Sequence, residues 1–129
     1  MFLALDLMTI THQELVKRFV PDSWTDMVYA THMTVAFNPD EKTLLEFAPH
    51  MNQWFNIDIL GIVNEPEGIC LLVKPELPIV SRNKWPHITL AMREGIPPKF
   101  SNEMIQKAEK IDWNIGSWSR INGKLVLLP

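Results

Sequence analysis

The stretch HMTVAF at residues 32–37 has a near copy, HITLAM, at residues 87–92. Both read His, apolar, Thr, apolar, Ala, apolar. Alternation of this kind over six residues predicts a half-buried β-strand, because successive side chains of a strand point to opposite faces. The chain is therefore expected to contain two strands of the same design, and the rest of the fold is organised around them.

Each of these strands is expected to present one core face and one open face. The core faces carry the large apolar side chains of Met33, Val35, Phe37, Ile88, Leu90 and Met92. The open faces carry the remaining side chains of the two stretches, which are His32, Thr34, Ala36, His87, Thr89 and Ala91. If the two strands lie side by side, two histidines and two threonines line one cleft.

Such a cleft suits phosphoryl chemistry. An unperturbed imidazole titrates at about pH 6.5, so one ring can accept a proton from an attacking water while the other donates a proton to the leaving oxygen. The hydroxyls of Thr34 and Thr89 can donate to the non-bridging oxygens and stabilise their growing negative charge. This arrangement requires no metal and no other cofactor. The residues leave open which of His32 and His87 is the acid.

Paired His-apolar-Thr-apolar motifs, one in each half of a small α+β protein, resemble the signature of the 2H phosphoesterase superfamily. Its members include 2′,3′-cyclic phosphodiesterases of RNA repair, ligT-like RNA enzymes and phage enzymes that degrade cyclic oligonucleotide signals. The resemblance implies a two-lobed, pseudo-symmetric fold of mostly antiparallel sheets with flanking helices, and places the motifs on adjacent central strands. It also implies that His32 and His87 are the catalytic pair and that Thr34 and Thr89 bind phosphate.

Capping signals predict three helices between the strands. THQE at residues 11–14 has the spacing of a capping box, with Thr11 as the N-cap. In NPDE at residues 38–41, Asn38 is predicted to cap a second helix. Ser101 is predicted to cap a third. Together with the strands, these helices indicate an α+β fold with a largely antiparallel sheet.

Alternation and turn signals predict the other strands. The start of the chain, MFLALDLM, reads as a first strand, and the first histidine strand is expected to extend from Val28 to Phe37. Apolar runs at residues 55–63 and 69–74, separated by NEPEG, predict a hairpin. Near the end of the chain, Asn122-Gly123 predicts the two-residue turn of a further hairpin.

Composition limits the class of protein. The length of 129 residues predicts a single compact domain, residues 1–129. The net charge of −3 argues against binding of long duplex nucleic acid, but it allows a small cyclic nucleotide, an oligonucleotide or an RNA end. The apolar start is too short to span a bilayer, so no membrane association is expected. Cys70, the only cysteine, is expected to be buried in the core of a cytoplasmic protein.

Residues near the second stretch are candidates for substrate binding. Trp85 precedes His87 by two positions; it is expected either to stack on a nucleobase or to pack at the strand entry. Lys84, Arg82 and Lys99 could attract phosphate, with solvated surface charge as the alternative for each.

The leading prediction is a metal-independent phosphodiesterase that opens 2′,3′-cyclic phosphates of nucleotides or RNA ends, or a related cyclic nucleotide bond. One alternative is a phage-type enzyme that degrades cyclic oligonucleotide immune signals. Another is a metal-dependent phosphohydrolase, less favoured because the open faces offer no carboxylate. A third is a binding module that holds a nucleotide or RNA end without cleaving it. All of them require both imidazoles to reach one shared anion.

Overall fold

The computed structural model describes residues 1–24, 27–107, 111–113 and 120–129. Its elements, in chain order, are β1 (Phe2–Leu7), α1 (Thr9–Phe19), β2 (Met27–Val28), β3 (His32–Phe37), α2 (Glu41–Phe47), the 3-10 turn η1 (Ala48–His50), β4 (Trp54–Glu65), β5 (Gly68–Pro75), β6 (His87–Met92), α3 (Phe100–Lys107) and β7 (Arg120–Leu128). The predicted α+β class and the β4–β5 hairpin are confirmed.

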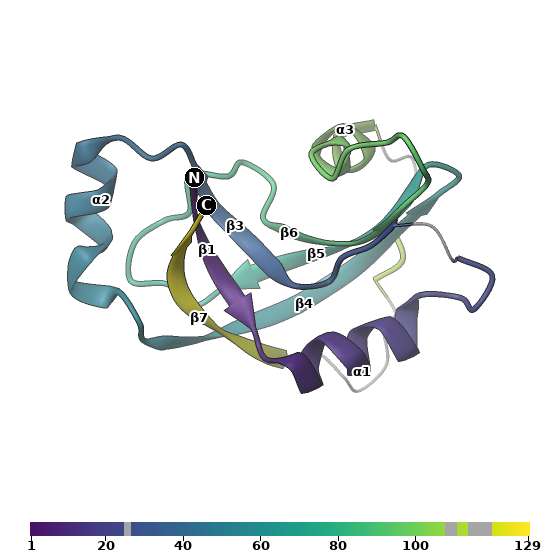
Figure 1. The fold of residues 1–129 in the computed structure, drawn as a ribbon, viewed down its shortest axis with the longest axis horizontal. Helices are drawn as coiled ribbons and strands as arrows, with labels where there is room; N and C mark the ends of the chain where they lie inside the picture. Colours follow the sequence, from purple (N-terminus) through teal and green to yellow (C-terminus); the bar gives the residue numbers. More distant parts are fainter. Residues whose placement is uncertain (25–26, 108–110, 114–119) are drawn as a thin grey trace.

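The strands form one sheet in the order β2-β6-β5-β4-β7-β1-β3, and all its neighbouring strands are antiparallel. The central pair β4–β7 joins two half-sheets, β6-β5-β4 and β7-β1-β3. Apart from the two-residue strand β2, which pairs with the outer edge of β6, each half-sheet ends on one histidine strand, and this matches the expected two-lobed, pseudo-symmetric design. In Figure 1, α1 lies on one side of the strands and α3 on the other.

The two histidine strands are not neighbours in the hydrogen-bonded order, so the expectation of adjacent central strands is wrong in this respect. They nevertheless run beside each other in space (Figure 1), because the sheet curls until its two ends meet. The segment just before β3 ties the ends together: the backbone N–H groups of Tyr29 and Ala30 donate to the carbonyls of Leu90 and Thr89, both at 2.8 Å. Curvature, rather than strand pairing, brings the two motifs to one place.

The segment between β2 and β3 also interrupts the strand predicted for residues 28–37. Ala30 has a φ of 53°, in the left-handed region that non-glycine residues rarely adopt. A strand cannot continue through this conformation, so β2 ends at Val28 and β3 begins at His32. The side chain of His12 in α1 hydrogen-bonds the Ala30 carbonyl at 3.2 Å and helps to hold the bend.

A β-bulge occurs at the fourth residue of each histidine strand. In the β1–β3 pair the partners step from Ala36 to Thr34, so Val35 is the extra residue. In the β5–β6 pair they step from Ala91 to Thr89, so Leu90 is the extra residue. A bulge of this type locally changes which face the following side chains occupy. The repeated sequence is thus matched by a repeated backbone irregularity.

The bulges overturn the face prediction for the last two positions of each stretch. Ala36 and Ala91 lie in the main core, not on the open face. Phe37, predicted to be buried, is 74% exposed, whereas Met92 is fully buried but packs in a second cluster away from the main core. The predicted core positions that precede or form the bulges are fully buried, as expected: Met33, Val35, Ile88 and Leu90.

Two helices begin before the predicted cap. Helix α1 starts at Thr9 because a single residue, Met8, separates it from β1, and no side chain caps it. Thr11 therefore lies inside the helix. Helix α3 starts at Phe100, so Ser101 is not its cap and is instead fully buried.

The second helix begins later than predicted. Asn38 has a φ of 45°, a left-handed conformation that asparagine tolerates well, and it completes the turn out of β3. Asp40 is the N-cap instead, since its carboxylate accepts a hydrogen bond from the Thr43 backbone N–H at 2.8 Å. An aspartate in this position is a favourable cap.

The predicted turn at Asn122-Gly123 is wrong: both residues lie within the continuous strand β7. The remainder of that predicted hairpin, residues 114–119, lies outside the described residues. Gly123 is buried between Leu7 of β1 and Phe55 of β4. A Cβ at this position would lie 2.9 Å from the Cβ of Leu5. Gly123 therefore allows β7 and β1 to approach each other closely, and it does not form a turn.

We expect Gly123→Ala to lower the free energy of unfolding by about 1–3 kcal/mol, because the added methyl overpacks the centre of the sheet. Urea denaturation measures the change. Asn122→Ala is the control: this exposed neighbour should shift stability by less than about 0.5 kcal/mol. Equal stability of Gly123→Ala and the unaltered protein would contradict the close approach.

Two apolar clusters hold the layers together. The main core fills one side of the sheet and includes Leu15 from α1. The second cluster packs Met104 and Ile105 of α3 against β4, β5 and β6, through Val63, Cys70 and Met92 among others. Cys70 is buried as predicted. This second cluster fixes the start of α3 beside the histidine strand β6.

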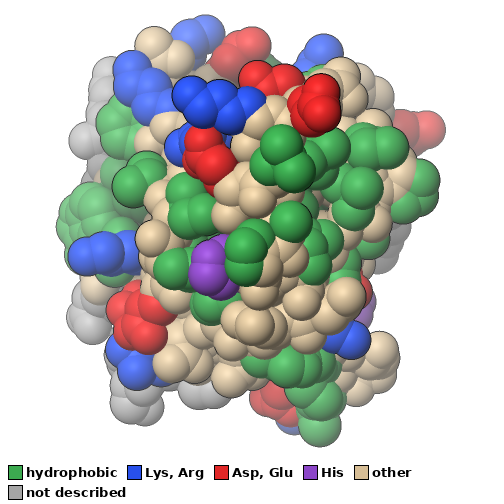
Figure 2. All heavy atoms as spheres, turned by 90° about the vertical axis from the view of Figure 1, so that its left-hand side faces the viewer, with side chains coloured by type: hydrophobic (Ala, Val, Ile, Leu, Met, Phe, Trp, Pro, Cys, Tyr) green, Lys and Arg blue, Asp and Glu red, His purple; other side chains and the backbone are tan. Residues whose placement is uncertain are grey.

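The surface at the α2 end of the molecule is mixed in character. Figure 2 shows apolar side chains over much of this face, with most of the visible charged side chains toward its edges. Over the described part of the chain, the most exposed large apolar side chains are Val80, Phe37 and Leu45. Scattered exposure of this kind is usual for folded proteins. No helix among the described residues is long and apolar enough to cross a membrane.

Candidate active site

A cavity of ≈ 640 Å³ lies between β3, β6, the loop after β5 and the start of α3. Its lining contains all four side chains singled out by the repeated stretches: His32, Thr34, His87 and Thr89. The other lining residues are Phe2, Tyr29, Thr31, Phe37, Arg82, Asn83, Pro98, Lys99 and Asn102. Both histidine strands therefore open into one shared space.

His87 is the more enclosed of the two histidines, with 8% of its surface exposed. Its Nδ1 lies 2.6 Å from the Trp85 carbonyl oxygen. Because a carbonyl can only accept, Nδ1 carries the proton and the neutral ring keeps a free lone pair on Nε2. Burial lowers the pKa of His87, and the hydrogen bond to Trp85 opposes this to a smaller extent. The neutral ring can therefore accept a proton at Nε2.

His32 has a more polar environment. Its Nδ1 lies 3.0 Å from the Thr31 hydroxyl, and its ring centroid is 5.0 Å from that of Phe2. Burial lowers the pKa of His32, Asp6 raises it, and the nearby charge of His87 lowers it again. Asp6 stands directly opposite His32 in the β1–β3 pairing. His32 thus has a carboxylate beside it that favours its protonated form.

The two threonines differ, although their sequence contexts match. The Thr89 hydroxyl lies 2.8 Å from the Ser101 hydroxyl and donates a long hydrogen bond, 3.4 Å, to the Pro98 carbonyl. The Thr34 hydroxyl has no hydrogen-bond partner within the described part of the chain. The Thr89 hydroxyl is held in place by hydrogen bonds to α3 and to the loop before it. The Thr34 hydroxyl can donate to a ligand without giving up another hydrogen bond.

Two cations line the cavity. Arg82 also forms an ion pair with Glu46 of α2, while Lys99 comes from the loop before α3. The other predicted binding residues, Trp85 and Lys84, are not part of the lining: Lys84 Nζ lies 5.7 Å from the centroid of the Trp85 ring. A role for these two side chains in binding stays a prediction. Trp85 contributes to the site through its carbonyl.

Several residues at the site were not predicted from the sequence. Phe37 was assigned to the core because the bulge that turns it has no local signal. Asn83 lies in a segment without a regular pattern, whereas Tyr29 and Asn102 lie in a predicted strand and a predicted helix in which nothing marked them as site residues. Asp6 did have a signal, since it is the only charged residue in the apolar strand FLALDL.

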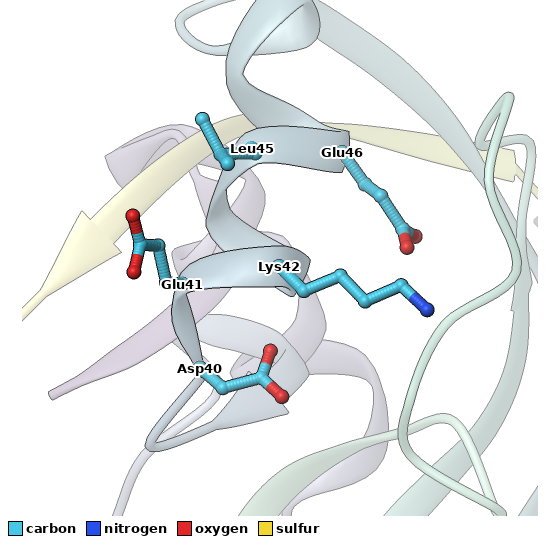
Figure 3. Close-up of a pocket in the computed structure, with 5 residues that line it drawn as sticks. All are labelled: Asp40, Glu41, Lys42, Leu45 and Glu46. Carbon is cyan, nitrogen blue, oxygen red and sulfur yellow. The ribbon is translucent and has the colours of Figure 1, made fainter.

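A second hollow, ≈ 700 Å³, lies along α2 (Figure 3). Lys42 and Glu46 extend to one side of the helix, and Glu41 and Leu45 to the other. Two of its three acidic groups already have structural partners, because Asp40 caps the helix and Glu46 pairs with Arg82. Among the described residues, no group of three or more His, Cys, Asp or Glu side chains could hold a metal ion.

An α+β fold that directs one His-x-Thr strand from each half into a common cavity defines a 2H-type phosphoesterase. A family model described as the fungal tRNA ligase phosphodiesterase domain matches residues 8–126, and the chain belongs to this family. The chain is accordingly a cyclic phosphodiesterase, a hydrolase that acts on cyclic phosphate. Neither a curated protein nor a solved structure gives a significant match.

Proposed function

We propose that the chain opens 2′,3′-cyclic phosphates at RNA ends or on nucleotides, without a metal, by acid/base catalysis with His32 and His87. The observation that carries this proposal is the shared cavity, which is lined by both imidazoles and by the Thr34 and Thr89 hydroxyls. The matching family, a tRNA ligase phosphodiesterase domain, favours an RNA end as the substrate. We also propose that residues 1–129 act as one domain, since a single sheet joins both halves, and that it works in the cytoplasm.

The proposed base is His87. The bond from its Nδ1–H to the Trp85 carbonyl leaves Nε2 to take a proton from a water molecule. The resulting hydroxide attacks phosphorus, and the bond from phosphorus to one ribose oxygen breaks. Meanwhile Thr34 and Thr89 donate hydrogen bonds to the non-bridging oxygens as negative charge grows on them.

The proposed acid is His32. Asp6 lies across the strand pair from it and favours the imidazolium, which gives its proton to the departing ribose oxygen. After this step His32 is neutral and His87 is protonated, so His87 must release a proton to solvent and His32 must gain one before the next turnover. The two imidazoles have the same sequence context but different neighbours, and this difference supports the division of roles.

The remaining lining residues support a nucleotide or the end of an RNA strand as the ligand. Phe37 presents an exposed ring at the cavity, and stacking on such a ring is worth about 1–3 kcal/mol per base. Lys99 adds positive charge for phosphate. A cavity of ≈ 640 Å³ falls in the range that encloses a small ligand.

A product-resolved assay in excess EDTA tests the proposal. The substrates are 2′,3′-cyclic mononucleotides, oligoribonucleotides with a 2′,3′-cyclic end, and cyclic di- and trinucleotides, followed by mass spectrometry. We expect turnover of the 2′,3′-cyclic substrates, with gain of one water. Turnover of the cyclic oligonucleotides alone would support the signal-degrading alternative. Binding without turnover by folded protein would leave only the binding module, and activity that EDTA abolishes would contradict metal independence.

The pH dependence of kcat/KM provides a test of the two roles. Activity needs one neutral and one protonated imidazole, and burial lowers the pKa of both rings from 6.5. We therefore expect a bell-shaped profile with its maximum below pH 6.5. The acidic limb reports protonation of the base, and the alkaline limb reports loss of the proton from the acid.

Asp6→Asn should shift the alkaline limb to lower pH and leave the acidic limb in place. The substitution removes the carboxylate that raises the pKa of His32, so the acid loses its proton earlier as pH rises. Asp58→Asn is the matched control, because Asp58 pairs with Arg120 on β7 and should not affect the profile. A shift of the acidic limb instead would reverse the two roles.

A further inference from the structure

The Thr89 hydroxyl is the end of a short buried chain of hydrogen-bonding groups. Ser101, in the first turn of α3, is fully buried and its hydroxyl lies 2.8 Å from that of Thr89. Cys70 is fully buried on β5 and stands directly opposite Thr89 in the β5–β6 pairing. Three polar side chains from three elements thus meet beside the cavity.

The number of hydroxyl protons determines the donor and the acceptor in each of these hydrogen bonds. Thr89 has one hydroxyl proton and donates it to the Pro98 carbonyl, which can only accept. Ser101 must therefore be the donor in its contact with Thr89. The hydrogen bonds run from Ser101 to Thr89 to Pro98.

The last bond in this series is weak. The Thr89 to Pro98 distance is 3.4 Å, whereas hydrogen bonds between O–H and O are usually 2.7–2.8 Å. An anionic oxygen in the cavity is a stronger acceptor than a carbonyl at this distance. The hydroxyl can exchange one acceptor for the other by a small rotation, while the donation from Ser101 remains.

We propose that Ser101 is a positioning residue for phosphate binding, which directs the Thr89 hydroxyl proton toward a non-bridging oxygen of the cyclic phosphate. This inference rests on the proposed phosphate-binding role of Thr89. Thr34 lacks an equivalent partner among the described residues, so the two halves of the site bind phosphate differently despite their matching motifs.

A double-mutant cycle tests the proposal. We expect Ser101→Ala to lower kcat by about 3- to 10-fold, the value of one ordinary hydrogen bond, with KM little changed. In a Thr89→Val background, the same substitution should cost less than about 2-fold, since the hydroxyl that it positions is gone. Equal losses in both backgrounds would mean that Ser101 acts through the packing of α3, and would overturn the proposal.

A second substitution covers a Ser101→Ala variant that folds poorly. Ser101→Cys keeps nearly the volume of the side chain but supplies only a weak donor, so it should lower kcat in the Thr89 protein and cost less than about 2-fold in the Thr89→Val protein. Equal losses in both backgrounds would overturn the proposal. An unaltered protein without activity would instead contradict the proposed function itself.

Discussion

Replacing either His32 or His87 with alanine is expected to lower kcat by about 10²- to 10⁴-fold, the usual contribution of a general acid or base. The double variant should be little worse than the slower single variant, because proton removal and proton donation belong to one concerted exchange. Steady-state kinetics on a 2′,3′-cyclic oligoribonucleotide measure all three variants. The same variants should still bind the reaction product, since the threonines and the aromatic rings remain.

His50→Ala is the matched control for this experiment. His50 lies in η1, near Phe55, and is not part of the cavity lining. Its removal should leave kcat within a factor of about two. Activity that survives in both His32→Ala and His87→Ala would show that the chemistry takes place elsewhere. A loss of kcat in the double variant equal to the product of the two single losses would contradict the paired mechanism.

Thr34→Val should lower kcat by about 10²- to 10³-fold, with little change in stability. The effect is of the size found when one preorganised donor to a developing oxyanion is removed. Because the Thr34 hydroxyl has no partner within the described residues, its loss should change the free energy of unfolding by less than about 0.5 kcal/mol. Parallel kinetics and urea denaturation separate the two effects.

Thr89→Val should show a similar loss of kcat together with a loss of stability of about 1–3 kcal/mol. Here the substitution also leaves the buried Ser101 hydroxyl without its acceptor. The contrast between the two threonines is the informative result, because their sequence contexts predict equal behaviour. Equal stabilities of the two variants, or unchanged kcat in both, would contradict the geometry of the phosphate site.

The side chains that are proposed for the chemistry could be picked out from local patterns, and the structure brings them into one cavity. The period of two in HMTVAF and HITLAM correctly predicted that Met33, Val35, Ile88 and Leu90 face the core and that each His-Thr pair faces an open side. Strand alternation depends only on the backbone of a few successive residues, which explains why it can be read without knowledge of the fold. The two histidines and two threonines were also identified from the repetition alone.

Predictions at the ends of elements failed where distant contacts compete with local preferences. Asn122-Gly123 has the composition of a turn, but the close approach of β1 makes it part of a strand. Serine is a residue type that often caps helices, but the Ser101 hydroxyl hydrogen-bonds that of Thr89 instead. Both predictions were wrong, because the role of each residue depends on neighbours far away in the sequence.

The sequence by itself determined which side chains are proposed to carry the chemistry and which strands present them. Only the tertiary structure decided how these side chains meet. The sheet curls so that its two ends come together, and the bulge in β3 turns Phe37 outward. Asp6 lies beside His32 and not beside His87. The physical reason is that these features arise from contacts between segments distant in the chain, and such contacts leave no periodic trace in either segment. Two nearly identical stretches therefore become two unequal halves of one site.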